Sequence, residues 1–422
     1  MNRRRFLQAA ASLAAAAAAL EARARQPLLM NPCRAPALGA LAESPWLARV
    51  WQGLDPAEVW DVHVHLAGIG DSDGGLHVGS RLLSPWHPIL YGQRLAYLNA
   101  GCVSGEPGTV DENYVRRLAA LARGLPAGVK ALLFAFDWYH DDDGRPAPEK
   151  STFHVPDAYA ARVAEDHPDV FAWAASIHPY APDAVDRLEA AAARGAKAVK
   201  WLPAAQNIDP AARRCDAFFA ALARLRLPLI THCGAEKAAQ SASLEHFGNP
   251  LRLRRALDAG ARVVVAHCAS AGRDEDLDQP GKRRTSFELF TRLMERPEWK
   301  GNLFGDISAI VLRNRKPSVL RALLEREDWH GRLLNGSDYP LPGILPLISP
   351  AALARDGLLP KEAVADLEKL REHNPLYFDL ALKRNLSWRG KTFPARVFAT
   401  RGFFEGKPYQ IHDGALKVEG KS

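Results

Sequence analysis

Two histidines separated by one residue, His63 and His65, are the first residues of the chain whose spacing suggests chemistry. They lie in the run Asp61–His65, which reads as a strand, and side chains two apart on a strand share a face. Both imidazoles are therefore expected to point the same way, with Val62 and Val64 directed toward surrounding helices. Two imidazoles at the carboxyl end of a strand can bind one divalent metal ion. Because an H-x-H pair also arises by chance, the assignment needs further residues.

Four later residues of suitable type lie at or near the ends of other strand candidates: Lys200, His232, His267 and Asp338. Histidines supply neutral nitrogen donors to Zn²⁺ or a similar ion, and the ion lowers the pKa of bound water toward neutrality. Asp338 can accept the proton of that water and pass it to a leaving group. His267 is expected either to bind the metal or to orient substrate or water.

Lys200 leaves two alternatives open. An ammonium group cannot bind a metal, but a lysine that has reacted with CO₂ becomes a carbamate, which can bridge two ions. Without carboxylation, Lys200 would form a salt bridge or contact the substrate. The sequence therefore predicts one divalent ion, or two if Lys200 is carboxylated, and the histidine donors favour zinc.

The elements that position these residues alternate in type. Short β-branched or apolar runs are separated by amphipathic helical stretches, which predicts an α/β fold and specifically a (β/α)8 TIM barrel. The carboxyl ends of all eight strands meet at one mouth of such a barrel, where an active site is expected. The insertion 66–130 holds helix candidates Pro88–Asn99 and Glu112–Ala122. The strand candidates are Val59–Leu66, Lys130–Asp137, Val170–Pro179, Ala196–Leu202, Pro228–Cys233, Arg262–Cys268, Asn302–Ser308 and Arg332–Asp338.

With these residues in this order, residues 59–385 resemble the amidohydrolase superfamily, specifically its amidohydrolase 2 branch. The resemblance implies a distorted (β/α)8 barrel and a metal site built from five strands. Its ligands would be His63 and His65 on strand one, a frequently carboxylated Lys200 on strand four, His232 and His267 on strands five and six, and Asp338 on strand eight. The resemblance does not identify a substrate.

The leading functional hypothesis is a metal-dependent hydrolase that cleaves a C–N or C–O bond of a small molecule, such as an amide, cyclic amide, ester or lactone. His267 and Asp338 are its expected catalytic residues. One alternative is a non-oxidative decarboxylase, as in relatives that use one zinc and no strand-four lysine. The other is an exported barrel that binds metal but is catalytically inert.

Other polar residues at strand ends are candidates for substrate contact. They are Asp137, Trp138, Tyr139, His140, His178, Tyr180, Glu236 and Asp306. Cys233 and Cys268 directly follow inward histidines, so strand alternation turns them into packing positions. The G-x-S-x-G match at 70–74 lacks the strand and helix that a nucleophile elbow requires, and its two aspartates would oppose an oxyanion.

The N-terminal residues predict export. A pair of arginines followed by x-Phe-Leu, an Ala-rich stretch and Ala22-Arg23-Ala24 resemble a twin-arginine signal peptide, which predicts the periplasm and the export machinery as a partner. The predicted parts are a signal peptide at 1–24, an extension at 25–58, the catalytic barrel at 59–387 and a C-terminal extension at 388–422. No other apolar run is long enough for a membrane span.

The composition is ordinary for a soluble globular protein with a sizeable core. The 422 residues are 47% hydrophobic and 24% charged, and residues 1–24 carry +3 of the formal net charge of +7, with four arginines against Glu21. No basic stripe with interleaved aromatic residues follows, which argues against a nucleic-acid partner. Five cysteines without a C-x-x-C exclude a disulfide scaffold but leave one disulfide open.

Overall fold

The computed structural model describes residues 30–103, 109–235 and 242–405. The predicted signal peptide and Glu236 lie outside these ranges. Within them all eight predicted barrel strands are present in the predicted order, although each is shorter than its candidate. They are β1 (Trp60–His65), β3 (Lys130–Phe134), β5 (Phe171–Ala174), β6 (Val199–Trp201), β7 (Leu229–His232), β8 (Val263–Ala266), β11 (Leu303–Asp306) and β12 (Leu333–Leu334).

The eight strands run parallel in two sheets, with orders β1-β3-β5 and β6-β7-β8-β11-β12. Backbone hydrogen bonds join the sheets at both edges. The amide of Lys200 donates to the carbonyl of Ala175 over 2.7 Å, and the amide of Asp338 donates to the carbonyl of His63 over 2.8 Å. The strands therefore follow one another around a ring, as the (β/α)8 prediction requires.

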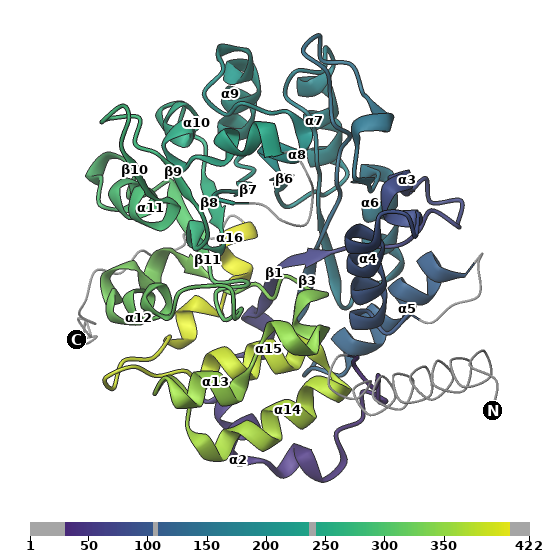
Figure 1. Cartoon of the computed structure of the whole chain (residues 1–422), viewed down its shortest axis with the longest axis vertical. Coiled ribbons are helices and arrows are strands. Elements are labelled where there is room, and N and C mark those ends of the chain that lie inside the picture. The colour runs from purple at the N-terminus through teal and green to yellow at the C-terminus, as the bar shows by residue number, and fades with distance from the viewer. Residues whose placement is uncertain (1–29, 104–108, 236–241, 406–422) are drawn as a thin grey trace, which may run out of the picture.

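Helices cover the outside of this ring (Figure 1). Gly195 and Gly260 have φ of 95° and 81° where two of the helices end, as expected of C-terminal caps. The outer and C-terminal helices are α6 (Asp157–Asp166), α7 (Ala184–Ala193), α8 (Pro203–Gln206), α9 (Asp216–Leu225), α10 (Arg254–Asp258), α11 (Ser286–Met294), α12 (Pro317–Glu325), α13 (Pro350–Arg355), α14 (Val364–His373) and α15 (Pro375–Arg384).

The interior of the barrel corrects one detail of the sequence analysis. Val62 does not face the helices: it packs with Trp60 and Phe134 in the buried interior cluster, while Val64 belongs to the outer core. The register of β1 against β3 shifts between Asp61 and Val64, so strict alternation does not hold there. An irregularity of this kind at a barrel rim re-aims side chains toward the site.

The C-terminal extension closes the barrel at the end opposite the mouth. Helix α16 (Arg401–Phe404) places Phe403 and Phe404 in the interior cluster, and the Phe404 ring stacks on Trp60 at 5.9 Å. The Thr400 hydroxyl donates to the Trp60 carbonyl over 2.6 Å. The described part of this extension, residues 388–405, therefore contributes to the barrel core.

The insertion after β1 forms a wall beside the mouth. It contains β2 (His77–Val78), α3 (Ser80–Leu83), α4 (Pro88–Ala100) and α5 (Val110–Arg123). Strand β2 pairs with β4 (Phe153–His154), and a second small ribbon joins β9 (Arg273–Glu275) to β10 (Arg283–Thr285). A disulfide joins Cys33 to Cys102, just beyond α4, and so fastens the N-terminal extension, which contains α2 (Pro45–Ala48), to this wall. In the described part of the chain no helix combines the length and apolarity that a bilayer crossing needs.

Candidate metal centre

All six residues proposed as ligands line one cavity of about 420 Å³ at the carboxyl ends of the strands. This volume suits a small molecule. Most of the remaining wall is apolar, with leucine, isoleucine, valine and phenylalanine side chains from the insertion, from β4 and from the segments after β11 and β12. The six predicted residues therefore form a small polar side of the cavity, which we call the floor, and the rest of the wall is mostly apolar.

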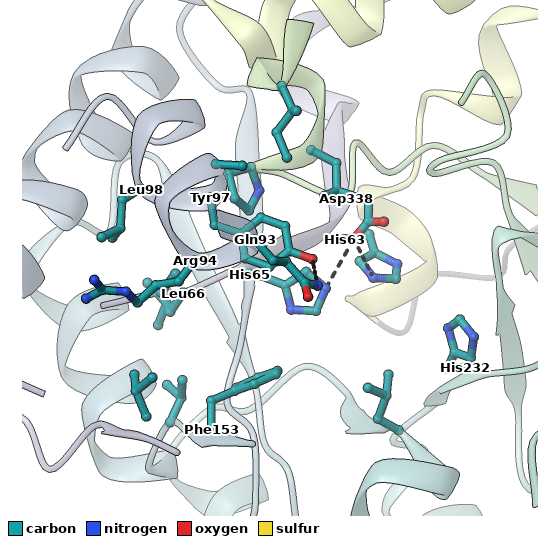
Figure 2. Close-up of a pocket in the computed structure, with 18 of the residues that line it drawn as sticks. His63, His65, Leu66, Gln93, Arg94, Tyr97, Leu98, Phe153, His232 and Asp338 are labelled. Carbon is teal, nitrogen blue, oxygen red and sulfur yellow. Dashed lines mark hydrogen bonds and ion pairs between the residues drawn. The ribbon is translucent and has the colours of Figure 1, made fainter. Parts of the chain in front are cut away.

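Three donor atoms meet closely at the floor. The Nε2 atoms of His63 and His65 lie 3.5 Å and 3.2 Å from Oδ1 of Asp338, and the donor atoms of the three residues are all within 4.8 Å of one another. Figure 2 shows His65, His63 and Asp338 pointing toward one another, with His232 farther along the floor. Two imidazole nitrogens and one carboxylate oxygen form a donor set that fits a divalent ion.

The other three proposed residues surround this group. Nε2 of His267 lies 3.8 Å from Oδ2 of Asp338, and the His267 ring meets the His232 ring edge-on at 5.4 Å. Lys200 is fully buried, and its Nζ lies 3.2 Å from Nε2 of His63. The structure thus brings together every residue of the predicted set.

Burial and charge place these groups in the forms that bind metal. Burial, with the nearby Lys200, lowers the pKa of His63 to about 4, and burial also holds the pKa of His267 well below its ordinary value. Burial alone would raise the pKa of Asp338, but His267, His63 and the hydrogen bond from His65 hold it well below its ordinary value. Neutral imidazoles beside an ionised carboxylate are what a divalent cation requires.

A second group of donor atoms lies within 4.8 Å, formed by His63, His267 and Asp306. Asp306 is fully buried and does not line the cavity. Its Oδ2 lies 2.9 Å from Nδ1 of His63, the ring atom opposite the one that faces Asp338. Nε2 of His63 is therefore the ring nitrogen that a metal ion in the cavity would meet. Asp306 was one of several candidates for substrate contact, and it is not among the residues that line the cavity.

Helix α4 supplies a part of the wall that the sequence analysis missed. Gln93, Arg94 and Tyr97 line the cavity, and the Gln93 amide donates to the Tyr97 hydroxyl over 2.7 Å. Figure 2 places Gln93 and Tyr97 next to His65, whereas Arg94 points away from the floor. The helix itself was predicted as Pro88–Asn99. The face of α4 that lines the cavity depends on how the insertion packs against the barrel. The spacing of residues within the helix does not predict this packing.

The β2–β4 ribbon forms another part of the wall. His77 and His154 are cross-strand neighbours that both line the cavity, and the Trp138 ring stacks on His154 at 3.9 Å. Burial lowers the pKa of His154 to about 4, so this imidazole is neutral at pH 7. Trp138 was a candidate for substrate contact, and here it supports a cavity residue instead.

Most of the other candidates stabilise loops outside the cavity. Asp137 accepts hydrogen bonds from the His178 amide at 2.9 Å and from Arg187 at 3.1 Å. The His140 and His178 rings stack at 4.1 Å, and the Tyr180 hydroxyl accepts from the Asp209 amide. Tyr139 donates its amide to Ser151.

The cysteines and the G-x-S-x-G match have structural roles too. Cys233 and Cys268 are buried and free, as the packing prediction requires. The Ser72 hydroxyl donates to Asp111 at the start of α5, and Asp71 accepts from the Val110 amide. Ser72 therefore binds the first turn of α5, which is a structural role.

Comparison with solved structures finds similar chains at low identity. One is an uncharacterised TIM-barrel protein from Bordetella bronchiseptica, with 17% identity, a TM-score of 0.43, and coverage of 74% of this chain and 99% of that one. Another is 5-carboxyvanillate decarboxylase from Novosphingobium aromaticivorans, solved with manganese and a nitrobenzoic acid, at 12% identity, TM-score 0.44, and 82% and 96% coverage. A third is 4-oxalomesaconate hydratase from Rhodopseudomonas palustris, at 12% identity, TM-score 0.40, and 84% and 95% coverage. These likenesses carry no information about the reaction of this chain.

No curated protein matches the chain. A family model described as amidohydrolase, by contrast, matches residues 60–377, from the start of β1 into α15. The match spans the complete ring of strands and includes all six residues that line the polar floor of the cavity. The chain belongs to the amidohydrolase-2 family of TIM-barrel proteins.

Proposed function

We propose that the chain is a metal-dependent hydrolase that cleaves a C–N or C–O bond of a small molecule, such as an amide, cyclic amide, ester or lactone. The observation that carries the proposal is the convergence of His63, His65 and Asp338 on one point of the cavity floor. His267, His232 and Lys200 complete the set of residues that would hold one or two ions, and nitrogen donors favour zinc.

A bound divalent ion supplies a water molecule of lowered pKa and polarises the substrate carbonyl. Asp338 takes up the proton of the attacking water at a carboxylate oxygen and passes it to the leaving amine or alcohol. The reaction adds water across the cleaved bond, so the products are an acid and that amine or alcohol. His267 lies beside Asp338 and is placed to orient substrate or water.

The test is turnover by the purified protein on panels of esters, lactones, amides and benzoate-type acids. We expect hydrolysis that stops when a chelator removes the metal and returns with zinc. His63→Ala and Asp338→Asn should each abolish it, whereas His167→Ala, which removes an imidazole beside Arg123 outside the cavity, should leave it unchanged. Full activity of either site variant contradicts the proposal.

The same panels separate the alternatives. Release of CO₂ from benzoate-type acids without hydrolysis of the other substrates would identify a decarboxylase. One ion per chain with an uncarboxylated Lys200 would accompany that result. Metal binding without turnover of any substrate would leave an inert metal-binding barrel.

We also propose export to the periplasm by the twin-arginine route. The Arg3-Arg4-Arg5-Phe6-Leu7 run supports it, and so does the Cys33–Cys102 disulfide, because disulfides persist in oxidising compartments. Replacing Arg3 and Arg4 by lysine should retain the protein in the cytoplasm. Periplasmic protein with an unprocessed N-terminus, or export of the lysine variant, would contradict this assignment.

A further inference from the structure

Asp306, at the carboxyl end of β11, is surrounded by hydrogen-bond donors. Its Oδ2 faces Nδ1 of His63 at 2.9 Å. Its Oδ1 accepts from the backbone amides of His267 at 2.9 Å and Ser308 at 3.0 Å, and from the Ser308 hydroxyl. Three hydrogen bonds from fixed donors, two of them backbone amides, converge on this one oxygen, and hydrogen bonds to the charged form favour it. We therefore take Asp306 as an ionised carboxylate.

This carboxylate decides where His63 carries its proton. Because Oδ2 of Asp306 can only accept, Nδ1 of His63 must carry the hydrogen in the bond between them. The other ring nitrogen, Nε2, then keeps its lone pair, and Nε2 is the atom that faces Asp338 at 3.5 Å. The buried contact thus presents a lone pair to the cavity.

Asp306 also sets the tautomer of His267, through the hydroxyl of Ser308. The Ser308 hydroxyl has one hydrogen, which it donates to Oδ1 of Asp306. Its oxygen lies 2.7 Å from Nδ1 of His267, so the hydrogen of that contact must come from the imidazole. Nε2 of His267 then also keeps its lone pair, and it lies 3.8 Å from Oδ2 of Asp338.

We propose that Asp306 is a positioning residue that sets the tautomers of two metal-binding histidines, His63 directly and His267 through Ser308. This inference rests on the proposed function, which assigns a metal to the cavity side of both rings. Carboxylates behind metal-binding histidines orient the ring and raise its basicity, and their loss weakens metal binding roughly 10–100-fold. Asp306 acts on the ion only through the two histidines, since its oxygens are engaged behind them.

The decisive variant is Asp306→Asn. One of its two polar atoms becomes an NH₂ group, which presents hydrogen where the carboxylate accepted. That change favours a hydrogen on Nε2 of His63 or His267, the atom needed for the metal. We expect zinc affinity, measured by competition with a chromophoric chelator, to fall roughly 10–100-fold. Ser308→Ala should cause a smaller loss, because Asp306 still accepts from His63 and the Ser308 carbonyl, 3.2 Å from Nδ1 of His267, remains.

Asp274→Asn is a matched control. Asp274 is another buried carboxylate that accepts a serine hydroxyl, that of Ser286 at 2.6 Å, but it does not line the metal cavity. Its substitution should leave zinc affinity unchanged. Long-range ¹H–¹⁵N NMR of the metal-free protein gives an independent result. The wild type should show His63 and His267 protonated at Nδ1, and Asp306→Asn should shift hydrogen toward Nε2.

The outcomes separate this inference from the function on which it rests. If the wild type binds zinc and Asp306→Asn binds it equally tightly, the positioning role is wrong and the metal site stands. If the variant loses one of two ions while the other keeps its affinity, Asp306 is a ligand and the inference is again wrong. If the wild type binds no metal, the proposed function fails, while the tautomers of the metal-free protein still decide the role of Asp306. Should Asp306→Asn not fold, Ser308→Ala carries the same test for His267.

Discussion

Nζ of Lys200 lies 3.2 Å from Nε2 of His63, the ring nitrogen that faces the cavity. An ammonium at this distance occupies the space that a metal bound to Nε2 would need, and its charge opposes a cation. The lysine must therefore lose its charge or move when the site is loaded. Reaction with CO₂ replaces the positive charge by a negative one. The ammonium first loses a proton, and the neutral amine then adds CO₂ and releases a second proton to give an anionic carbamate.

We predict that the zinc-loaded protein carries a carboxylated Lys200 and two ions per chain. With ¹³C-labelled bicarbonate, the wild type should show a carbamate ¹³C resonance that Lys200→Met lacks. Metal analysis should find the second ion lost in the variant. An unchanged ion count in Lys200→Met, together with no carbamate signal in the wild type, would show that the lysine moves aside instead.

A pH dependence of stability is expected from His178. Burial, with the adjacent charge of His140, lowers the pKa of His178 from 6.5 to about 3. Between these values the unfolded chain binds a proton that the folded chain does not. The stabilisation is therefore complete above pH 6.5 and is lost as the pH falls toward 3, by about 2 kcal/mol at pH 5.

The matched variant is His178→Gln. Its amide oxygen can accept from the Tyr180 amide and its NH₂ can donate to the Gln206 carbonyl, as the imidazole nitrogens do, but it does not titrate. Urea unfolding with a chelator present, which removes any contribution from metal, should show a smaller loss between pH 7.5 and pH 5 than in the wild type. Equal losses would mean that His178 is not responsible.

The buried pair of Asp379 and Lys383 on α15 is expected to be costly to break. Lys383 donates to Asp379 and to the Gly336 carbonyl, each over 2.6 Å, and both side chains are inaccessible. Burial raises the pKa of Asp379 to about 7 even against the charge of Lys383. Lys383→Met should lower the free energy of unfolding by roughly 3–5 kcal/mol, because it leaves Asp379 buried without its partner.

Two further variants test the cause of the stability loss in Lys383→Met. Adding Asp379→Leu should recover most of the loss, since an apolar pair replaces the charged one. Lys391→Met removes the exposed bridge to Glu327 and should cost about 1 kcal/mol or less. If the double variant is no more stable than Lys383→Met alone, the unpaired Asp379 is not the cause of the loss.

The Cys33–Cys102 disulfide is expected to stabilise both the fold and the cavity wall. It closes a separation of 69 residues, for which chain entropy predicts roughly 4 kcal/mol. Because Cys102 lies just beyond α4, reduction should loosen Gln93 and Tyr97. We expect a lower melting temperature and a higher KM, with unchanged metal content. The double alanine variant should show the same changes and no further response to reductant, and an unaltered KM would exclude a link to the wall.

The six floor residues were predictable because each belongs to a strand end, and the barrel brings such ends together. His232 and Asp338 are more than a hundred residues apart in sequence, yet strand order alone predicts that they meet. The wall was not predictable, since Tyr97 and His154 reach the cavity from segments whose packing depends on tertiary contacts. Val62 was placed wrongly because a register shift is a property of the pair β1–β3 and not of either sequence. Asp306 was singled out by its position, but only the Ser308 and His63 contacts reveal its role.

The insertion after β1 could be replaced without changing the residues of the cavity floor. Every floor residue comes from the ring of strands, whereas Gln93, Arg94 and Tyr97 come from α4, which contributes none of the proposed metal donors. A segment spanning α3 and α4 could be exchanged between related barrels as a cassette, which would alter substrate choice and leave the reactive centre intact. Because the disulfide links this insertion to the N-terminal extension, Cys33 and the residues around it have to be transferred together with α4 and Cys102.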